Sequence, residues 1–125
     1  MTLRLAPDLP RIEVPASVVE LALTNLLSNA IKYSDAGKPH RYAEVRGSRD
    51  AAGKLVVEVA DNGVGVPPDV RPRLFERFFR APSAGSEEGT GLGLSIVREA
   101  VEQLGGEAWL AAADGAETVF AFSLP

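Results

Sequence analysis

The stretch SVVELALTNLLSNAIKYS, residues 17–34, has the apolar periodicity of an amphipathic helix. Ser17 and Glu20 match a capping box, in which each side chain satisfies a free backbone N–H group at the start of a helix. We therefore expect a helix that follows Ser17, continues to about Tyr33 and ends at the turn residues 35–39. The apolar arc of this helix should pack on the core, and it contains Leu23, Leu26, Leu27, Ala30 and Ile31.

The opposite arc of this helix carries an unusual set of polar side chains. Asparagine is a poor helix former, yet Asn25 and Asn29 lie one turn apart. A face that merely contacts water would favour Glu, Lys or Gln, although a solvated face remains the alternative. An asparagine carbonyl can bind Mg²⁺, Lys32 can pair with a phosphate, and Tyr33 can form an aromatic wall.

The segments on either side of this helix predict a sheet with further helices. Residues 2–14 are interrupted by Pro7 and Pro10 and should form short extended pieces. Gly105 and Gly106 are expected to end the last helix. Strands are predicted at 42–48, 54–60, 107–112 and 117–124, and helices at about 70–75 and 92–104. This order predicts an α+β fold, a two-layer α/β sandwich in which about three helices cover one face of a mixed, mostly antiparallel sheet of about five strands.

The composition is that of one globular domain. The chain has 125 residues, of which 46% are hydrophobic and 24% charged, no cysteine, and a formal net charge of −4. The acidic balance argues against a nucleic-acid-binding module, and the lack of cysteine excludes disulfides and thiolate metal sites. No apolar run of the sequence is long enough to cross a bilayer. We expect a single domain over residues 1–125 that binds no nucleic acid and makes no membrane contact.

The segment DNGVGVP, residues 61–67, follows an apolar strand pattern. An Asn-Gly pair between hydrophobic residues is a common hairpin signal, but the next three residues lead into two prolines and make a poor second arm. The other interpretation places Asp61 at the end of a buried strand, where its carboxylate accepts a hydrogen bond from a ligand amino group. Gly63 and Gly65 would then let the backbone lie close to a flat ring. From the residues alone, both interpretations are open.

A glycine-rich helix start, GTGLGLSIV at residues 89–97, follows the loop residues 81–88. The free N–H groups of a helix N-terminus favour an anion, and glycines allow close approach, so this stretch is a candidate phosphate site. The alternative is a glycine-rich turn before a core helix. Upstream lies FERFFR at residues 75–80, which contains Arg77 and Arg80. These arginines can reach phosphates. The alternative is that the segment only anchors a loop by burying its aromatic rings.

Four stretches of the chain resemble, in their order along the sequence, the sequence boxes of the ATP-binding catalytic domain of bacterial sensor histidine kinases. This domain belongs to the superfamily that includes gyrase, Hsp90 and MutL. NLLSNAIKYS is similar to the N box, DNGVGVP to the G1 box, FERFFR to the F box and GTGLGLSIV to the G2 box. Phe79 stands where the F box usually has tyrosine. The resemblance runs from about Thr2 to Pro125 and implies the Bergerat ATP-binding fold.

The resemblance implies a site for ATP and Mg²⁺ and assigns roles along the first helix. Asn29 would bind Mg²⁺ through its side chain, and Asn25 would lie one turn earlier in the same site. Lys32 would contact a phosphate, and Tyr33 would line the adenine or the ribose.

The same resemblance assigns the remaining site residues. Asp61 would accept a hydrogen bond from the adenine amino group in a pocket shaped by Gly63 and Gly65. Arg80 and Arg77 would approach the terminal phosphate. A mobile ATP lid would cover about residues 81–90, and the backbone groups that hold the phosphates would be those of Thr90, Gly91, Leu92 and Gly93.

The resemblance also implies a reaction. Related ATPases and anti-sigma serine kinases carry a glutamate, which acts as a general base, at the position where this chain has Asn25. A neutral imidazole is already nucleophilic, so a kinase that phosphorylates histidine depends less on such a base. We expect transfer of the γ-phosphoryl group of ATP to a histidine on a separate dimerisation domain of the same or a partner kinase, and from there to a response regulator. His40 lies in a loop sequence unlike an acceptor helix, so the dimerisation, phosphoacceptor and sensor domains are expected outside this chain.

Two other functions remain open on the sequence. One is an anti-sigma-type serine kinase, and the other is a non-catalytic module that senses nucleotide by changing shape. In each case we expect the isolated domain to be a cytoplasmic monomer, whether or not its parent protein is attached to a membrane.

Overall fold

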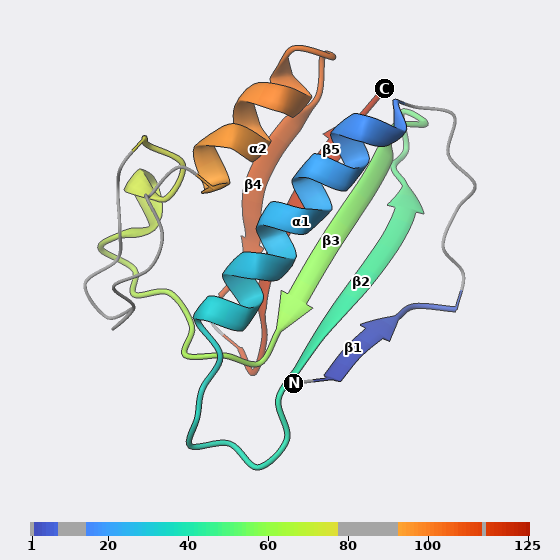
Figure 1. The fold of residues 1–125 in the computed structure, drawn as a ribbon. Helices are drawn as coiled ribbons and strands as arrows, with labels where there is room; N and C mark the ends of the chain where they lie inside the picture. The colour runs from blue at the N-terminus through green and yellow to red at the C-terminus, as the bar shows by residue number, and fades with distance from the viewer. Residues whose placement is uncertain (1, 8–14, 78–92, 114) are drawn as a thin grey trace.

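A computed structural model describes residues 2–7, 15–77, 93–113 and 115–125 of the chain. These residues form a five-stranded sheet of order β1-β2-β3-β5-β4, and two α-helices lie on one of its faces (Figure 1). Strand β1 pairs with β2 in parallel, and all other neighbours are antiparallel. The elements are β1 (Thr2–Leu5), α1 (Ala16–Lys32), β2 (Tyr42–Arg49), β3 (Leu55–Asp61), the 3₁₀ helix η1 (Arg71–Arg73), α2 (Gly93–Glu102), β4 (Glu107–Ala112) and β5 (Thr118–Leu124).

This architecture confirms the predicted α+β sandwich with its mixed, mostly antiparallel five-stranded sheet. The described residues supply two α-helices and the short helix η1 where about three helices were expected. Neither described α-helix combines the length and the apolarity that crossing a membrane requires.

The start of α1 differs from the predicted capping box. Pro15 occupies the N-cap position with φ −55°, and no side chain caps the helix. The Pro15 carbonyl oxygen accepts hydrogen bonds from the N–H groups of Val18 and Val19, at 3.1 and 3.4 Å. Helical hydrogen bonding therefore begins at Pro15, and Ser17 already lies inside the first turn, where it cannot act as the N-cap. The predicted capping box is wrong, whereas the predicted end at Tyr33 is confirmed.

The core lies between the two helices and the sheet. Its fully buried side chains include those of Phe122, Leu55, Leu124, Val59, Val97 and Val101. Helix α1 buries Leu26 and Ala30 as predicted, but Ile31 of the same predicted arc is 61% exposed. On α2 the buried side chains are Ser95, Val97 and Val101, while Leu104, at the end of the helix predicted at about 92–104, is 38% exposed. Each helix therefore buries a narrower stripe than its apolar pattern suggests.

The end of α2 is packed directly on the backbone of β5. Gly105 has φ 85°, in the left-handed region, and the N–H of Gly106 donates to Val101 O at 2.8 Å. A Cβ atom on Gly106 would lie 1.9 Å from the carbonyl oxygen of Ser123. The predicted glycine cap is thus confirmed, and it also sets how closely α2 approaches the sheet.

Candidate functional site

Asp61 is the last residue of β3, the middle strand of the sheet, and its carboxylate is buried. Asp61 is 5% exposed and stands opposite Thr118 of β5, which is also 5% exposed. The N–H of Gly63 donates a 2.9 Å hydrogen bond to Asp61 Oδ1. Burial raises the pKa of the Asp61 carboxyl to about 6, although the hydrogen bond from Gly63 opposes this effect. The charge of Glu117 raises this pKa further, and that of Lys38 lowers it. At neutral pH the group is therefore mainly an ionised hydrogen-bond acceptor.

The turn after β3 is held against the C-terminal end of α1. The N–H of Val64 donates to Tyr33 O at 3.0 Å. A Cβ atom on Gly63 would lie 2.3 Å from that same oxygen and 2.9 Å from Asp61 Oδ1, so only glycine fits there. Gly65 has φ 81°, which glycine adopts without strain. The Asn-Gly pair therefore turns the chain out of the sheet, and the hairpin interpretation is wrong.

A cavity of about 360 Å³ opens beside this turn. It is walled by the α1–β2 connection, the turn after β3 and the segment before β5, through residues that include Lys38, Gly63, Gly65, Pro67, Ala116 and Thr118. Because Thr118 is the cross-strand neighbour of Asp61, the cavity reaches the position next to the buried carboxylate.

The predicted polar face of α1 meets the start of α2. Asn25 Nδ2 donates to Leu21 O at 2.8 Å, which fixes the orientation of the amide. A Cβ atom on Gly93, the first residue of α2, would lie 3.4 Å from Asn25 Oδ1, so the amide oxygen faces this helix start. Asn29 is half-buried one turn later, and Lys32 Nζ lies 5.3 Å from the ring centre of Tyr33. The structure thus gathers Asn25 and Gly93 at one place, with Asn29 and Lys32 along the same helix.

A divalent cation would need ligands other than a carboxylate cluster in the described part of the chain. No group of three or more His, Cys, Asp or Glu side chains that could hold a metal ion occurs there. An amide oxygen such as that of Asn29, completed by oxygens of the bound ligand and by water, would form an all-oxygen donor set that suits Mg²⁺.

The predicted arginine and lid residues are only partly described. Arg77 Nε donates to Glu99 Oε1 of α2 at 2.9 Å, so this guanidinium joins the segment after η1 to α2. Phe75 packs edge-on against Phe120, with ring centres 6.1 Å apart, which supports an anchoring role for this aromatic ring. The other predicted phosphate contacts, Arg80, Thr90, Gly91 and Leu92, and the predicted lid at residues 81–90 lie outside the described residues.

Several residues of the site were not predicted. Thr118 begins a row of alternate, buried β5 side chains that continues with Phe120 and Phe122. A single threonine at the start of such an apolar row is a sequence signal that could have identified Thr118 as a site residue. Lys38 lies in a connection without periodicity, and Asn62 belongs to the DNGVGVP segment, where only its neighbours Asp61, Gly63 and Gly65 were given roles at the site.

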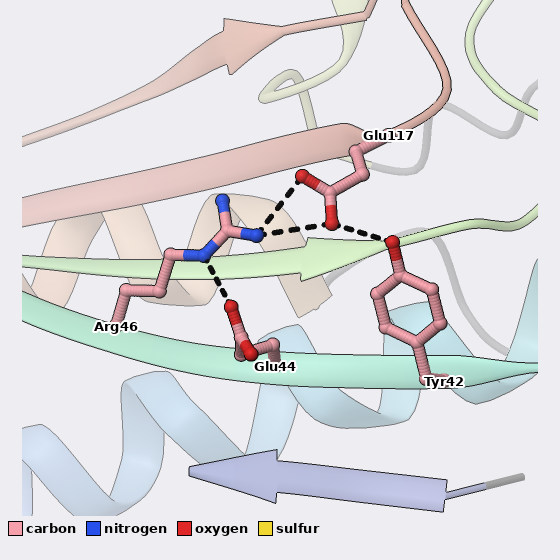
Figure 2. A network of polar contacts seen from close by, with 4 residues as sticks. All are labelled: Tyr42, Glu44, Arg46 and Glu117. Atoms are coloured by element: carbon pink, nitrogen blue, oxygen red, sulfur yellow. Dashed lines mark hydrogen bonds and ion pairs between the residues drawn. The ribbon is translucent and has the colours of Figure 1, made fainter. Parts of the chain in front are cut away.

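A network of polar side chains lies on the face of the sheet turned away from the helices (Figure 2). Tyr42 OH donates to Glu117 Oε2 at 2.6 Å, and Arg46 Nη2 donates to both oxygens of Glu117, at 2.9 and 3.0 Å. Arg46 Nε also donates to Glu44 Oε1 at 2.6 Å, and the Arg4 guanidinium lies 3.7 Å from the ring centre of Tyr42. The network therefore joins β1 and β2 to the residue that precedes β5.

Glu117→Gln is expected to lower the free energy of unfolding at pH 7 by about 1 kcal/mol, the scale of a partly exposed ion pair. The hydrogen bond from Tyr42 and the contacts with Arg46 hold the pKa of Glu117 below its ordinary value of 4.5. A lowered pKa in the folded state gives stability that is present above pH 4.5 and is lost as the pH falls below it. Urea unfolding at pH 7 and pH 3 tests this, with Glu107→Gln on β4 as the control; an equal deficit at both pH values would contradict it.

Residues 16–125 match the family described as histidine kinase-, DNA gyrase B-, and HSP90-like ATPase. The methanogenesis regulatory histidine kinase FilI of Methanothrix harundinacea is 40% identical over 121 residues, which are 97% of this chain and 13% of that protein. The sensor histidine kinase WalK of Bacillus subtilis is 33% identical over 117 residues, which are 91% of this chain and 19% of WalK. The chain therefore spans less than a fifth of the length of these two relatives.

Solved structures show the same arrangement of elements. The mycobacterial sensor histidine kinase MprB superposes with a TM-score of 0.79 at 34% identity, covering 99% of this chain and 81% of that one. Full-length ShkA in complex with AMPPNP superposes with a TM-score of 0.78 at 29% identity, covering 99% of this chain and 25% of that one.

Proposed function

The chain belongs to the family of histidine kinase-, DNA gyrase B-, and HSP90-like ATPases, and on this basis we propose that it is the ATP-binding catalytic domain of a sensor histidine kinase. The observation that carries the proposal is the buried Asp61 carboxylate, paired with Thr118 across the sheet and bounded by the Gly63 turn. A buried, ionised acceptor beside a cavity suits the amino group of a purine base.

The base end of the pocket fits adenine by shape and by charge. The close approach of Gly63 to Tyr33 O leaves no room for a side chain on the floor of the turn. Gly65 lines the cavity and has no atom within 4 Å of an added Cβ, so a flat ring would lie against backbone there, with its amino group directed to Asp61. Tyr33, at the C-terminal end of α1, would line the same ligand.

The phosphate end is formed by α1 and the start of α2. Asn29 would hold Mg²⁺ through its amide oxygen, and the ion would neutralise charge on the phosphate oxygens. Lys32 would contact a phosphate as a point charge, and the N-terminus of α2 at Gly93 offers backbone N–H groups. Contributions from Arg77, Arg80, Thr90, Gly91 and Leu92, and closure of a lid over residues 81–90, belong to the same proposal.

The proposed acceptor is a histidine on a separate dimerisation domain. Asn25 cannot take up a proton at neutral pH, and its amide is already bonded to Leu21 O, so this position does not supply a general base. A neutral imidazole nitrogen is nucleophilic without one. It would form a bond to the γ-phosphorus while the bond from that phosphorus to the bridging oxygen breaks and ADP leaves. The phosphoryl group would then pass to a response regulator.

Transfer of label tests this function. The chain is mixed with Mg²⁺, γ-labelled ATP and a separately prepared histidine-bearing dimerisation domain. The expected product is label on the acceptor that is stable to base and labile to acid. Acid-stable label would instead indicate a serine kinase, and tight ATP binding without any transfer would indicate a nucleotide-sensing module.

Asn29→Ala is expected to reduce the rate of transfer with Mg²⁺ by at least tenfold, because the ion loses its protein ligand. Binding of the base should persist, since Asp61 is on another element. The measurement is the initial rate of label transfer over a range of Mg²⁺ concentrations, with adenosine binding as the control. A rate equal to that of the unchanged chain at limiting Mg²⁺ would remove Asn29 from the metal site.

A further inference from the structure

The connection between α1 and β2, residues 33–41, is tied to the residue that follows Asp61. Asn62 Oδ1 accepts a 2.9 Å hydrogen bond from the N–H of Tyr42, and Asn62 Nδ2 donates to His40 O at 2.8 Å. Lys38 Nζ donates to the carbonyl oxygen of Asn62 at 2.6 Å. Asn62 thus makes three hydrogen bonds through its side chain and backbone, two with residues of this connection and one with the first residue of β2.

A second tie reaches the other side of the same site. Tyr42 binds Asn62 through its backbone N–H and Glu117 through its hydroxyl. Asn62 follows Asp61, and Glu117 precedes Thr118, the cross-strand neighbour of Asp61. Tyr42 therefore connects the residues that flank the buried Asp61–Thr118 pair.

These contacts point to a role beyond local folding. The turn at residues 61–64 must keep the Asp61 carboxylate and the Gly63 N–H in one geometry, because an acceptor aimed at a ligand works over a narrow range of distance and angle. The turn is bonded to Tyr33 O through Val64 and to the α1–β2 connection through Asn62. Loss of the Asn62 side chain would remove its bonds to Tyr42 N–H and His40 O and would leave the bond from Lys38 to the Asn62 carbonyl oxygen in place.

We propose that Lys38 and Asn62 are positioning residues for nucleotide recognition, which hold the turn at residues 61–64 so that Asp61 faces the base. This proposal rests on the proposed function, because it concerns the same pocket. Asn62 holds the position of the turn through its side-chain hydrogen bonds with Tyr42 N–H and His40 O. Lys38 acts both by its bond to the Asn62 carbonyl and by its charge, since it lines the cavity beside Gly63 and Thr118.

The charge of Lys38 gives the proposal a distinctive readout. Two charged groups act on Asp61, Lys38 from the α1–β2 connection and Glu117 from the segment before β5, and they act in opposite directions. With Lys38 removed, the pKa of Asp61 should rise, so ionisation of the acceptor should require a higher pH. A purely structural role would weaken binding equally at every pH.

The test is titration of the chain with a fluorescent ATP analogue between pH 5.5 and 8.5, using Asn62→Ala, Lys38→Met, Lys38→Arg and the control Lys54→Met. Lys54 precedes β3, at the opposite end of that strand from Asp61. We expect Asn62→Ala to weaken affinity at least tenfold at pH 7.5. We expect Lys38→Met to weaken it severalfold and to shift the pH midpoint of binding upward, whereas Lys38→Arg and Lys54→Met should keep the midpoint of the unchanged chain.

The outcomes separate the positioning role from the proposed function. Urea unfolding shows whether Asn62→Ala is folded at the temperature of the titration, and Lys38→Met tests the proposal if it is not. Affinities within twofold of the unchanged chain for Lys38→Met, with an unshifted midpoint, would overturn the positioning role while nucleotide binding stands. Failure of the unchanged chain to bind the analogue, or undiminished binding by Asp61→Asn, would overturn the proposed function and the positioning role together.

Discussion

Asp61→Asn is expected to abolish nucleotide binding and, at the same time, to raise the free energy of unfolding of the nucleotide-free chain at pH 7. The amide can keep the acceptor oxygen for the Gly63 N–H, but it presents an NH₂ group where the ligand amino group needs an acceptor. Two donors facing each other in a buried site leave both unpaired, which disfavours binding strongly.

The gain in stability follows from the raised pKa of Asp61. Its value in the folded chain is about 6, against an ordinary value of 3.8, so the folded state favours the protonated form. The stability linked to this group is therefore fully present below pH 3.8, falls as the pH rises towards 6, and is absent above it. A shift of this size corresponds to roughly 3 kcal/mol at most, and Asn62 and the rest of the turn are unchanged by the substitution.

Calorimetric titration with an ATP analogue and urea unfolding at pH 7 and pH 4 measure the two effects. The stability difference between Asp61→Asn and the unchanged chain should shrink as the pH falls from 7 to 4. A variant that binds the analogue with an affinity within tenfold of the original would show that the buried carboxylate does not recognise the base. A variant that is less stable than the original at pH 7 would contradict the stability gain expected from the raised pKa of Asp61.

Gly63→Ala is expected to remove nucleotide binding by moving the turn itself. The added methyl group would lie 2.3 Å from Tyr33 O and 2.9 Å from Asp61 Oδ1, and the nearer of these atoms is backbone at the end of a helix. Relief of this clash must displace the turn and break the Val64 N–H bond to Tyr33 O. The cost to the free energy of unfolding should be on the order of 2 kcal/mol.

A glycine outside the site supplies the matched control. Gly53, in the turn between β2 and β3, has φ 84° but has no atom within 4 Å of an added Cβ. Gly53→Ala should therefore cost about 1 kcal/mol of backbone strain and leave affinity for the ATP analogue unchanged. Equal losses of affinity in Gly63→Ala and Gly53→Ala would mean that general destabilisation, rather than the position of the turn, controls binding.

The regular elements of the fold follow closely from local patterns. The strand predicted at residues 54–60 is β3 at Leu55–Asp61, and the one predicted at 117–124 is β5 at Thr118–Leu124. On β3 the row Leu55, Val57, Val59 and Asp61 is completely buried, and on β5 all seven residues are buried, so both strands read as strongly apolar runs. The position of Asp61 at a strand end is predicted for the same reason, since the apolar run stops where the carboxylate begins.

Features that depend on distant neighbours are not visible in local patterns. Periodicity identifies the apolar arc of α1, but it does not show which part of that arc the rest of the fold covers, and Ile31 is 61% exposed. The pairing of Asp61 with Thr118 is a matter of register between strands far apart in the chain. Lys38 and Asn62 act through the path of a connection, and that path is set by tertiary contacts rather than by any repeat in the sequence.

The place of β5 between β3 and β4 has a consequence for biosynthesis. A ribosome completes β3 and β4 before it makes β5, so a nascent chain lacks the inner strand that both of them border. Until Thr118 and the strand that follows it emerge, Asp61 has no cross-strand neighbour on that side, and its carboxyl remains in water with an ordinary acidity. An unfinished chain should therefore lack the nucleotide pocket that we propose beside the Asp61–Thr118 pair.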